Sequence, residues 1–163
     1  MTEEVLQVLC AGLGTLAFAL FFHVRPNHLF LATLGGALSW VLYLVVRGQT
    51  GSVFCSALVA AMGICFWAEC FARLRKAPAT IFLIPGIVPL LPGGALYYTM
   101  NAIISEDMVC MIQKAKETGM MVLGIVLGIL VASEIVRVLQ WLYFHRDKFV
   151  RQRTLPLPPS KKP

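Results

Sequence analysis

The sequence predicts an all-α membrane protein with about five transmembrane helices. The chain of 163 residues is 58% hydrophobic and only 13% charged, and its mean hydropathy is +0.78. Several long uncharged runs approach the roughly 20 residues of helix that cross a bilayer. One further uncharged run, Ala77 to Ser105, is interrupted by prolines and glycines. We therefore expect a polytopic transmembrane domain, residues 1–145, followed by a basic, proline-rich cytoplasmic tail, residues 146–163.

The first three predicted spans are uncharged and end at polar or charged turns. Glu3 and Glu4 precede the first span, where a cleavable signal peptide would carry basic residues, so this span is not predicted to be removed. We expect the three spans at about Val5–Phe22, Leu29–Val46 and Val53–Ala68.

The fourth span, about Ala79–Met100, is predicted to be broken. Its prolines remove backbone donors and crowd the preceding turn. Backbone groups freed in a membrane must find partners in protein or in a water-filled cavity, and broken helices of this kind bind substrate in secondary transporters. We therefore predict the substrate site here. The candidate binding residues are Pro85, Gly86, Pro89, Pro92, Gly93, Gly94, Tyr97, Tyr98, Thr99 and Asn101.

The polar residues from Tyr97 to Asn101 have two possible roles. Their hydroxyl and amide groups follow the break and are suited to binding a polar substrate. Tyrosines also gather at membrane surfaces in aromatic belts. Both roles stay open at the level of the sequence.

The fifth span is expected at about Gly119–Phe144, after a charged connection, Glu106–Glu117, that we expect to form a short amphipathic helix at the interface. Within the span, Glu134 and Arg137 lie on one helix face. Ionisable groups inside a membrane are costly and suggest function. Glu134 is accordingly the candidate proton-coupling residue, and the alternative is a structural pair with Arg137 reaching the headgroups.

The cations predict the orientation of the chain. With five spans, one side of the membrane collects Arg25, Arg73, Arg75, Lys76 and the cations after residue 145, while the other side receives Arg47, Lys114 and Lys116. The positive-inside rule places the first side in the cytoplasm and the N-terminus outside. A segment that only dipped into the membrane would give four spans and leave the basic C-terminus outside, so the charges favour five crossings.

Other patterns exclude several classes of function. The net charge of +6 sits mostly beyond the spans, which suits anionic lipids better than nucleic acid. The five cysteines show no metal-binding spacing, and no catalytic set is visible. We expect no metal, no cofactor and no enzymatic activity. Small residues such as Gly124 and Gly128 predict close helix packing.

The stretch Ile84-Pro85-Gly86-Ile87-Val88-Pro89-Leu90-Leu91-Pro92-Gly93-Gly94-Ala95-Leu96-Tyr97-Tyr98-Thr99-Met100 resembles the proline-glycine signature of the bacterial threonine/serine exporter family. In length and span pattern the chain resembles the small transmembrane subunit of that family. The resemblance implies a larger transmembrane partner, location in the bacterial inner membrane, and export of threonine and serine or of a dicarboxylate such as succinate.

We therefore expect the small subunit of a two-component secondary transporter for small polar metabolites. Two halves with odd numbers of spans and opposed orientations would suit the inverted repeats of such transporters. The alternative is a non-transporting scaffold that stabilises the larger partner. Association of the chain with itself also remains possible.

Overall fold

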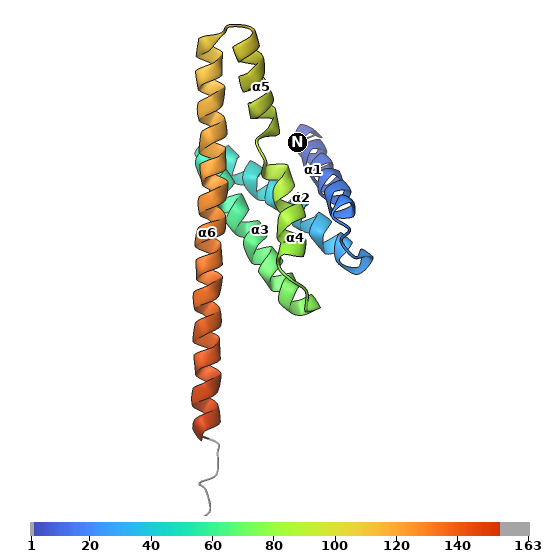
Figure 1. Cartoon of the computed structure of the whole chain (residues 1–163), viewed down its shortest axis with the longest axis vertical. Coiled ribbons are helices and arrows are strands. Elements are labelled where there is room, and N and C mark those ends of the chain that lie inside the picture. Colours follow the sequence, from blue (N-terminus) through green and yellow to red (C-terminus); the bar gives the residue numbers. More distant parts are fainter. Residues whose placement is uncertain (1, 154–163) are drawn as a thin grey trace, which may run out of the picture.

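The computed structural model describes the backbone of residues 2–153 and the side chains of residues 2–142. Within that part of the chain every regular element is helical, which confirms the predicted fold class (Figure 1). The elements are α1 (Thr2–Phe21), α2 (Pro26–Thr50), α3 (Val53–Arg75), α4 (Thr80–Ile87), the 3₁₀ turn η1 (Val88–Leu90), α5 (Gly93–Ile104) and α6 (Met108–Arg153).

Four of these helices are long and apolar enough to cross a membrane as continuous spans. They are Thr2–Phe21, Pro26–Thr50, Val53–Arg75 and the part of α6 from Met108 to Leu142. A fifth candidate consists of Thr80–Leu90 and Gly93–Ile104, which meet at a bend of 42°. The fourth predicted span is therefore broken, as expected from its prolines.

The relation between α3 and α6 shows that the bent pair crosses from one end of the bundle to the other. Gly124 lies against Ala57 and Gly128 against Ala61, so α3 and α6 run in the same direction. A chain that leaves the end of α3 must return to the opposite end before α6 can begin. The α4–α5 segment makes that return, which agrees with five crossings.

Small residues allow the close packing that the sequence predicted. A Cβ atom built on Gly124 would lie 2.6 Å from the Phe54 carbonyl oxygen, and one on Gly128 would lie 2.6 Å from the Leu58 carbonyl oxygen. Gly36 is in similarly close contact with Thr15 of α1. Backbones approach this closely only where no side chain intervenes.

Helix α6 is longer than the sequence predicted. The expected interfacial helix and the fifth span are one helix of 46 residues, which at 1.5 Å per residue measures about 70 Å. The Asp107 carboxylate accepts a hydrogen bond from the Cys110 N–H at 3.1 Å and so caps its start. No proline lies within residues 108–153 to break it. Lys114 and Glu117 form an ion pair along the helix at 3.1 Å.

The backbone of α6 continues beyond residue 145, where the tail was expected to begin, to Arg153. The proline-rich segment 154–163 lies outside the described residues.

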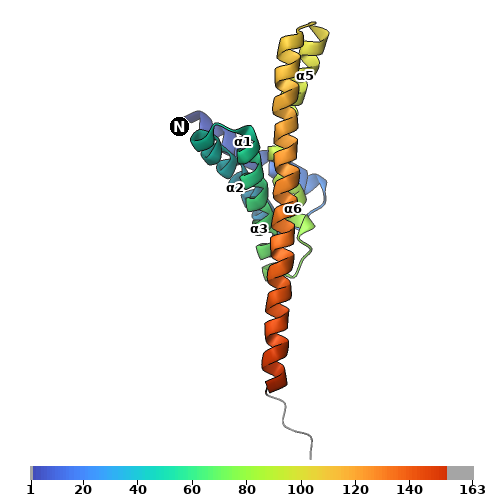
Figure 2. The ribbon, with the colours of Figure 1, turned by 90° about the vertical axis from the view of Figure 1, so that its left-hand side faces the viewer.

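The start of α6 pairs with α5 in an antiparallel arm, residues 93–119, that projects beyond the end of the other helices (Figures 1 and 2). The chain reverses between the two helices at Glu106, which adopts a positive φ of 56°. The arm carries the second half of the predicted substrate site, whereas α4 and η1 lie in the bundle.

Candidate functional site

The break in the fourth span occurs where backbone hydrogen bonding changes register. Pro85 lies inside α4, and after it the chain tightens into η1. Leu91 is extended, with ψ of 131°, and Pro92 has ψ of 50°, so neither residue continues a helix. The helix starts again at Gly93. Each proline lacks an N–H group, and together they account for the position of the break.

Gly86 joins the broken helix closely to the bundle. A Cβ atom at this position would lie 2.5 and 2.7 Å from two carbon atoms of Ile64 in α3. The Gly86 carbonyl oxygen accepts a hydrogen bond from the Ser39 hydroxyl of α2 at 3.0 Å, and that hydroxyl also lies 2.8 Å from the Gly36 carbonyl oxygen. A carbonyl near a helix end inside the membrane needs such a partner, and a buried side chain supplies it.

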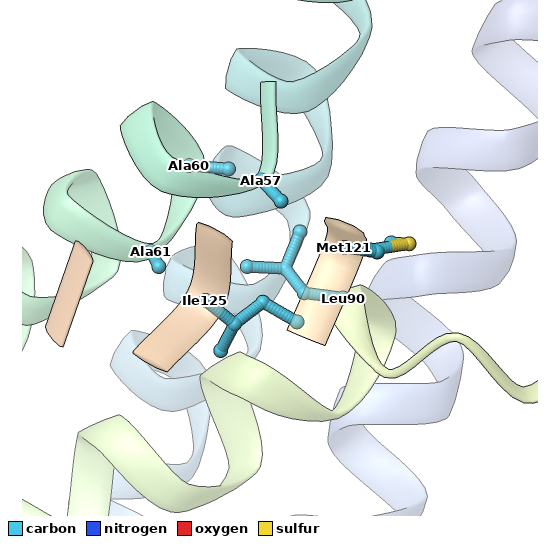
Figure 3. Packing of buried hydrophobic residues seen from close by; sticks show 6 residues of the cluster. All are labelled: Ala57, Ala60, Ala61, Leu90, Met121 and Ile125. Atoms are coloured by element: carbon cyan, nitrogen blue, oxygen red, sulfur yellow. The ribbon is translucent and has the colours of Figure 1, made fainter. Parts of the chain in front are cut away.

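Leu90 anchors the end of η1 in the hydrophobic core. It is fully buried and packs among Ala57, Ala60 and Ala61 of α3 and Met121 and Ile125 of α6 (Figure 3). The small alanines leave room for the leucine side chain. The break therefore lies next to a well-packed core rather than in a loose loop.

A shallow, open cavity of about 260 Å³ lies beside the break, between α1, α2 and η1. It is lined by Gln7, Cys10, Ala11, Trp40 and Pro89. The Trp40 indole stacks on Tyr43 with ring centroids 5.1 Å apart. Its Nε1–H is buried and has no hydrogen-bond partner among the described residues. A buried donor without a partner is costly, so Trp40 is a candidate to bind an acceptor if its ring turns towards the cavity.

The residues after the double glycine lie apart from this cavity. Tyr97 and Tyr98 are 67% and 56% exposed, and their rings meet edge to face at 5.5 Å. The Thr99 hydroxyl donates to the Ala95 carbonyl oxygen of its own helix at 2.8 Å. Gly93 and Gly94 face open space. The structure thus divides the predicted site between the bundle and the arm.

Glu134 is also remote from the break. Its carboxylate lies 3.0 Å from the Arg137 guanidinium, and both side chains are more than half exposed. Met121, which packs near Leu90, precedes Glu134 by more than three helical turns, or about 20 Å along α6. The pair expected from the sequence is present, but it does not approach the cavity beside Pro89.

The structure adds residues that the sequence did not single out, namely Ser39, Trp40 and Gln7. Ser39 and Trp40 are adjacent residues with polar groups in an apolar span, and Ser39 follows Gly36 by three residues. That pattern was a usable signal, because small residues bring backbones close and a nearby hydroxyl can then reach them. Gln7 carries no comparable pattern.

The described residues offer no site for a metal ion: no three His, Cys, Asp or Glu side chains there come together. All five cysteines are free thiols.

Apolar spans packed around a helix that is broken beside a cavity define a multi-pass membrane protein of the transporter class. A sequence model of the threonine/serine exporter (ThrE) family matches residues 7–135, and the chain belongs to that family. The family is one of membrane exporters rather than enzymes. No curated protein and no solved structure shows a significant match to the chain.

Proposed function

We propose that this chain is the small transmembrane subunit of a two-component exporter in the bacterial inner membrane, where it moves threonine and serine by alternating access. The observation that carries this proposal is the cavity at Pro89 beside the broken span, which is lined by Trp40, whose buried Nε1–H has no hydrogen-bond partner among the described residues. Membership of an exporter family supports the transport role. Succinate or another small dicarboxylate is the alternative cargo.

The two helix ends at the break suit a zwitterionic amino acid. The start of α5 has no side-chain cap, and the positive end of a helix dipole attracts a carboxylate. The end of α4 and η1 is the negative end of a helix dipole, which attracts an ammonium group. Pro85, Gly86, Pro89, Pro92, Gly93 and Gly94 would shape the backbone around the cargo.

The exposed and half-buried residues of α5 are proposed to contact the larger partner or the cargo during export. Tyr97, Tyr98, Thr99 and Asn101 lie on a helix that packs against α6. Large apolar side chains such as Met100 and Ile104 are also exposed there. A second transmembrane subunit would cover them. If this chain were only a scaffold, it would bind the larger subunit through the same surface.

The distribution of cations supports an orientation with the N-terminus outside and the C-terminus in the cytoplasm. Arg25, Arg75 and Lys76 line one cavity at one end of the bundle. Arg47 and Lys116 line another cavity with Ser52, at the start of α3. The more basic end is expected to face the cytoplasm. Reporter fusions at the two chain ends would test this orientation.

The transport proposal is tested by reconstituting the chain with and without its larger partner and measuring efflux of labelled threonine, serine and succinate. We expect amino-acid efflux only when both chains are present. Equal efflux by the partner alone would establish the scaffold role instead.

The Trp40→Phe variant tests the cavity itself, because it removes the N–H and keeps an aromatic ring. Loss of one hydrogen bond to substrate should reduce efflux about tenfold. Trp67→Phe is the matched control, since the Trp67 N–H already donates to the Leu31 carbonyl oxygen at 3.1 Å. The control should lower stability and leave efflux by the folded protein unchanged.

Glu134 is the candidate for proton coupling. Glu134→Gln should abolish proton-driven efflux and leave exchange of cargo across the membrane intact. Export that remains proton-dependent in this variant would remove Glu134 from the role and leave it as the structural partner of Arg137.

A further inference from the structure

A basic cavity of about 510 Å³ lies at the other end of the bundle from the arm, between the α1–α2 turn and the α3–α4 turn. Its lining includes no acidic residue. The basic residues in its wall are His23, Arg25, His28, Arg75 and Lys76.

The positive charge of this cavity is not neutralised by the side chains that the structure describes. Arg25, Arg75 and Lys76 form no ion pair there, and the nearby carboxylate of Glu69 pairs with Arg73 at 3.8 Å. Three cations close together repel one another unless an anion lies between them. The cavity is therefore matched to an anionic ligand.

Two helix N-termini add to the positive potential. Helix α2 begins after Arg25 and α4 begins after Ala79, and neither has a side-chain cap or an acidic residue in its first turn. Pro26 has no N–H, and the N–H groups of His28, Ile81 and Phe82 already donate to backbone carbonyl oxygens. The two N-termini therefore contribute mainly through the positive ends of their helix dipoles, which attract an anion.

His28 supplies a further unpartnered group in the wall of the cavity. Its Nδ1 atom is buried and has no hydrogen-bond partner among the described residues. The ring is held edge to face against Phe82, with centroids 5.6 Å apart. A buried ring nitrogen usually has a partner, and a turn of this ring would bring Nδ1 to a ligand in the cavity.

An apolar groove of about 260 Å³ continues from the basic cavity along α4. The two share Phe22, Val24 and Ile81, and the groove extends to Ile84 and Pro85. A free phosphate has no apolar part that could fill this groove, whereas a phospholipid has both an anionic headgroup and apolar acyl chains.

We propose that this cavity and groove form a binding site for an anionic phospholipid. The phosphate lies among Arg25, Arg75 and Lys76, and one acyl chain follows the groove towards Pro85. Both turns end membrane spans, so the site lies at the depth of the lipid headgroups, where basic pockets between helices bind anionic lipids. The proposal is independent of the transported cargo. Because the groove reaches Pro85, a bound lipid would contact the first half of the broken span.

Native mass spectrometry of the purified chain in detergent tests the proposal through titration with dioleoyl phosphatidylglycerol and, separately, dioleoyl phosphatidylcholine. We expect the anionic lipid to bind at least tenfold more tightly. Arg25→Gln, Arg75→Gln and Lys76→Gln should each weaken its binding about fivefold, and the triple variant about 100-fold. Unchanged far-UV circular dichroism and gel-filtration elution establish that each variant is folded.

Arg73→Gln is the matched control, because Arg73 belongs to the same end of α3 but does not line the cavity. Its binding of phosphatidylglycerol should stay within twofold. An equal loss in Arg73→Gln and Arg75→Gln would mean diffuse attraction to surface charge and would overturn the site. Glycerol phosphate that binds as tightly as the lipid would identify a soluble phosphate ligand and would overturn the lipid proposal.

Discussion

The two halves of the broken span are both uncharged and largely apolar, but they lie in different environments. The segment Thr80–Leu90 is packed inside the bundle, where Leu90 is fully buried and Gly86 contacts Ile64. The segment Gly93–Ile104 lies on the projecting arm, with Leu96, Tyr97 and Ile104 more than half exposed. Hydrophobicity therefore predicts that a segment is buried in lipid or protein, but it does not predict which of the two surrounds it. Close approach by small residues decides which half is held by its own chain.

Under the proposed transport role, the packed and exposed halves of the broken span would have different tasks. The packed half holds the break in a defined shape beside the Pro89 cavity. The exposed half is free to contact a partner or to change its angle at Leu91 and Pro92. Substitutions at matched positions in the two halves should therefore differ in their effect on stability.

Leu90→Ala should cause the largest loss. Removing a fully buried leucine side chain leaves a cavity among Ala57, Ala61 and Ile125, which costs about 3 kcal/mol in the free energy of unfolding. Leu96→Ala on the exposed half should cost less than about 1 kcal/mol. Unfolding in mixed detergent micelles measures both. Equal losses would mean that the two halves are packed alike.

Gly86→Ala should destabilise the chain by about 2 kcal/mol, because its Cβ would overlap the buried Ile64 side chain. Gly94→Ala faces open space and should be neutral or stabilise α5 by up to about 1 kcal/mol. The same unfolding assay compares them. A stable Gly86→Ala variant would show that the Ile64 side chain is not held against Gly86.

Ser39→Ala should have the smallest effect, about 1 kcal/mol, because it removes one hydroxyl proton that the Gly36 and Gly86 carbonyl oxygens share. Thr99→Ala provides the comparison in the exposed half, since the Thr99 hydroxyl bonds only within its own helix. We expect no more than about half that loss there. An infrared shift of a ¹³C-labelled Gly86 carbonyl on Ser39→Ala substitution would report the hydrogen bond directly.

The features that sequence reasoning predicted correctly rest on local chemistry. A proline lacks an N–H wherever it stands, so the break near Pro85, Pro89 and Pro92 followed from residue type alone. The spacing of Gly124 and Gly128 likewise predicted a packing face without knowledge of the partner helix.

The features that it missed depend on contacts far apart in the chain. No local pattern connects Ser39 to Gly86, because their hydrogen bond requires α2 and α4 to be adjacent. The charges of Lys114 and Glu117 suggested a separate connection, yet they form an ion pair within one helix. The separation of Tyr97 from Pro89 arises from the extended residues between η1 and α5.

Thiol labelling of Cys10 tests the central claim most directly, because Cys10 lines the cavity beside Pro89. The experiment uses the reconstituted two-component complex, with Cys10 as the only cysteine of this chain. A matched variant retains only Cys110, which lies at the start of α6. We predict that threonine slows labelling of Cys10 at least threefold and leaves labelling of Cys110 unchanged. Identical Cys10 labelling rates with and without threonine would contradict the assignment of this cavity to the cargo.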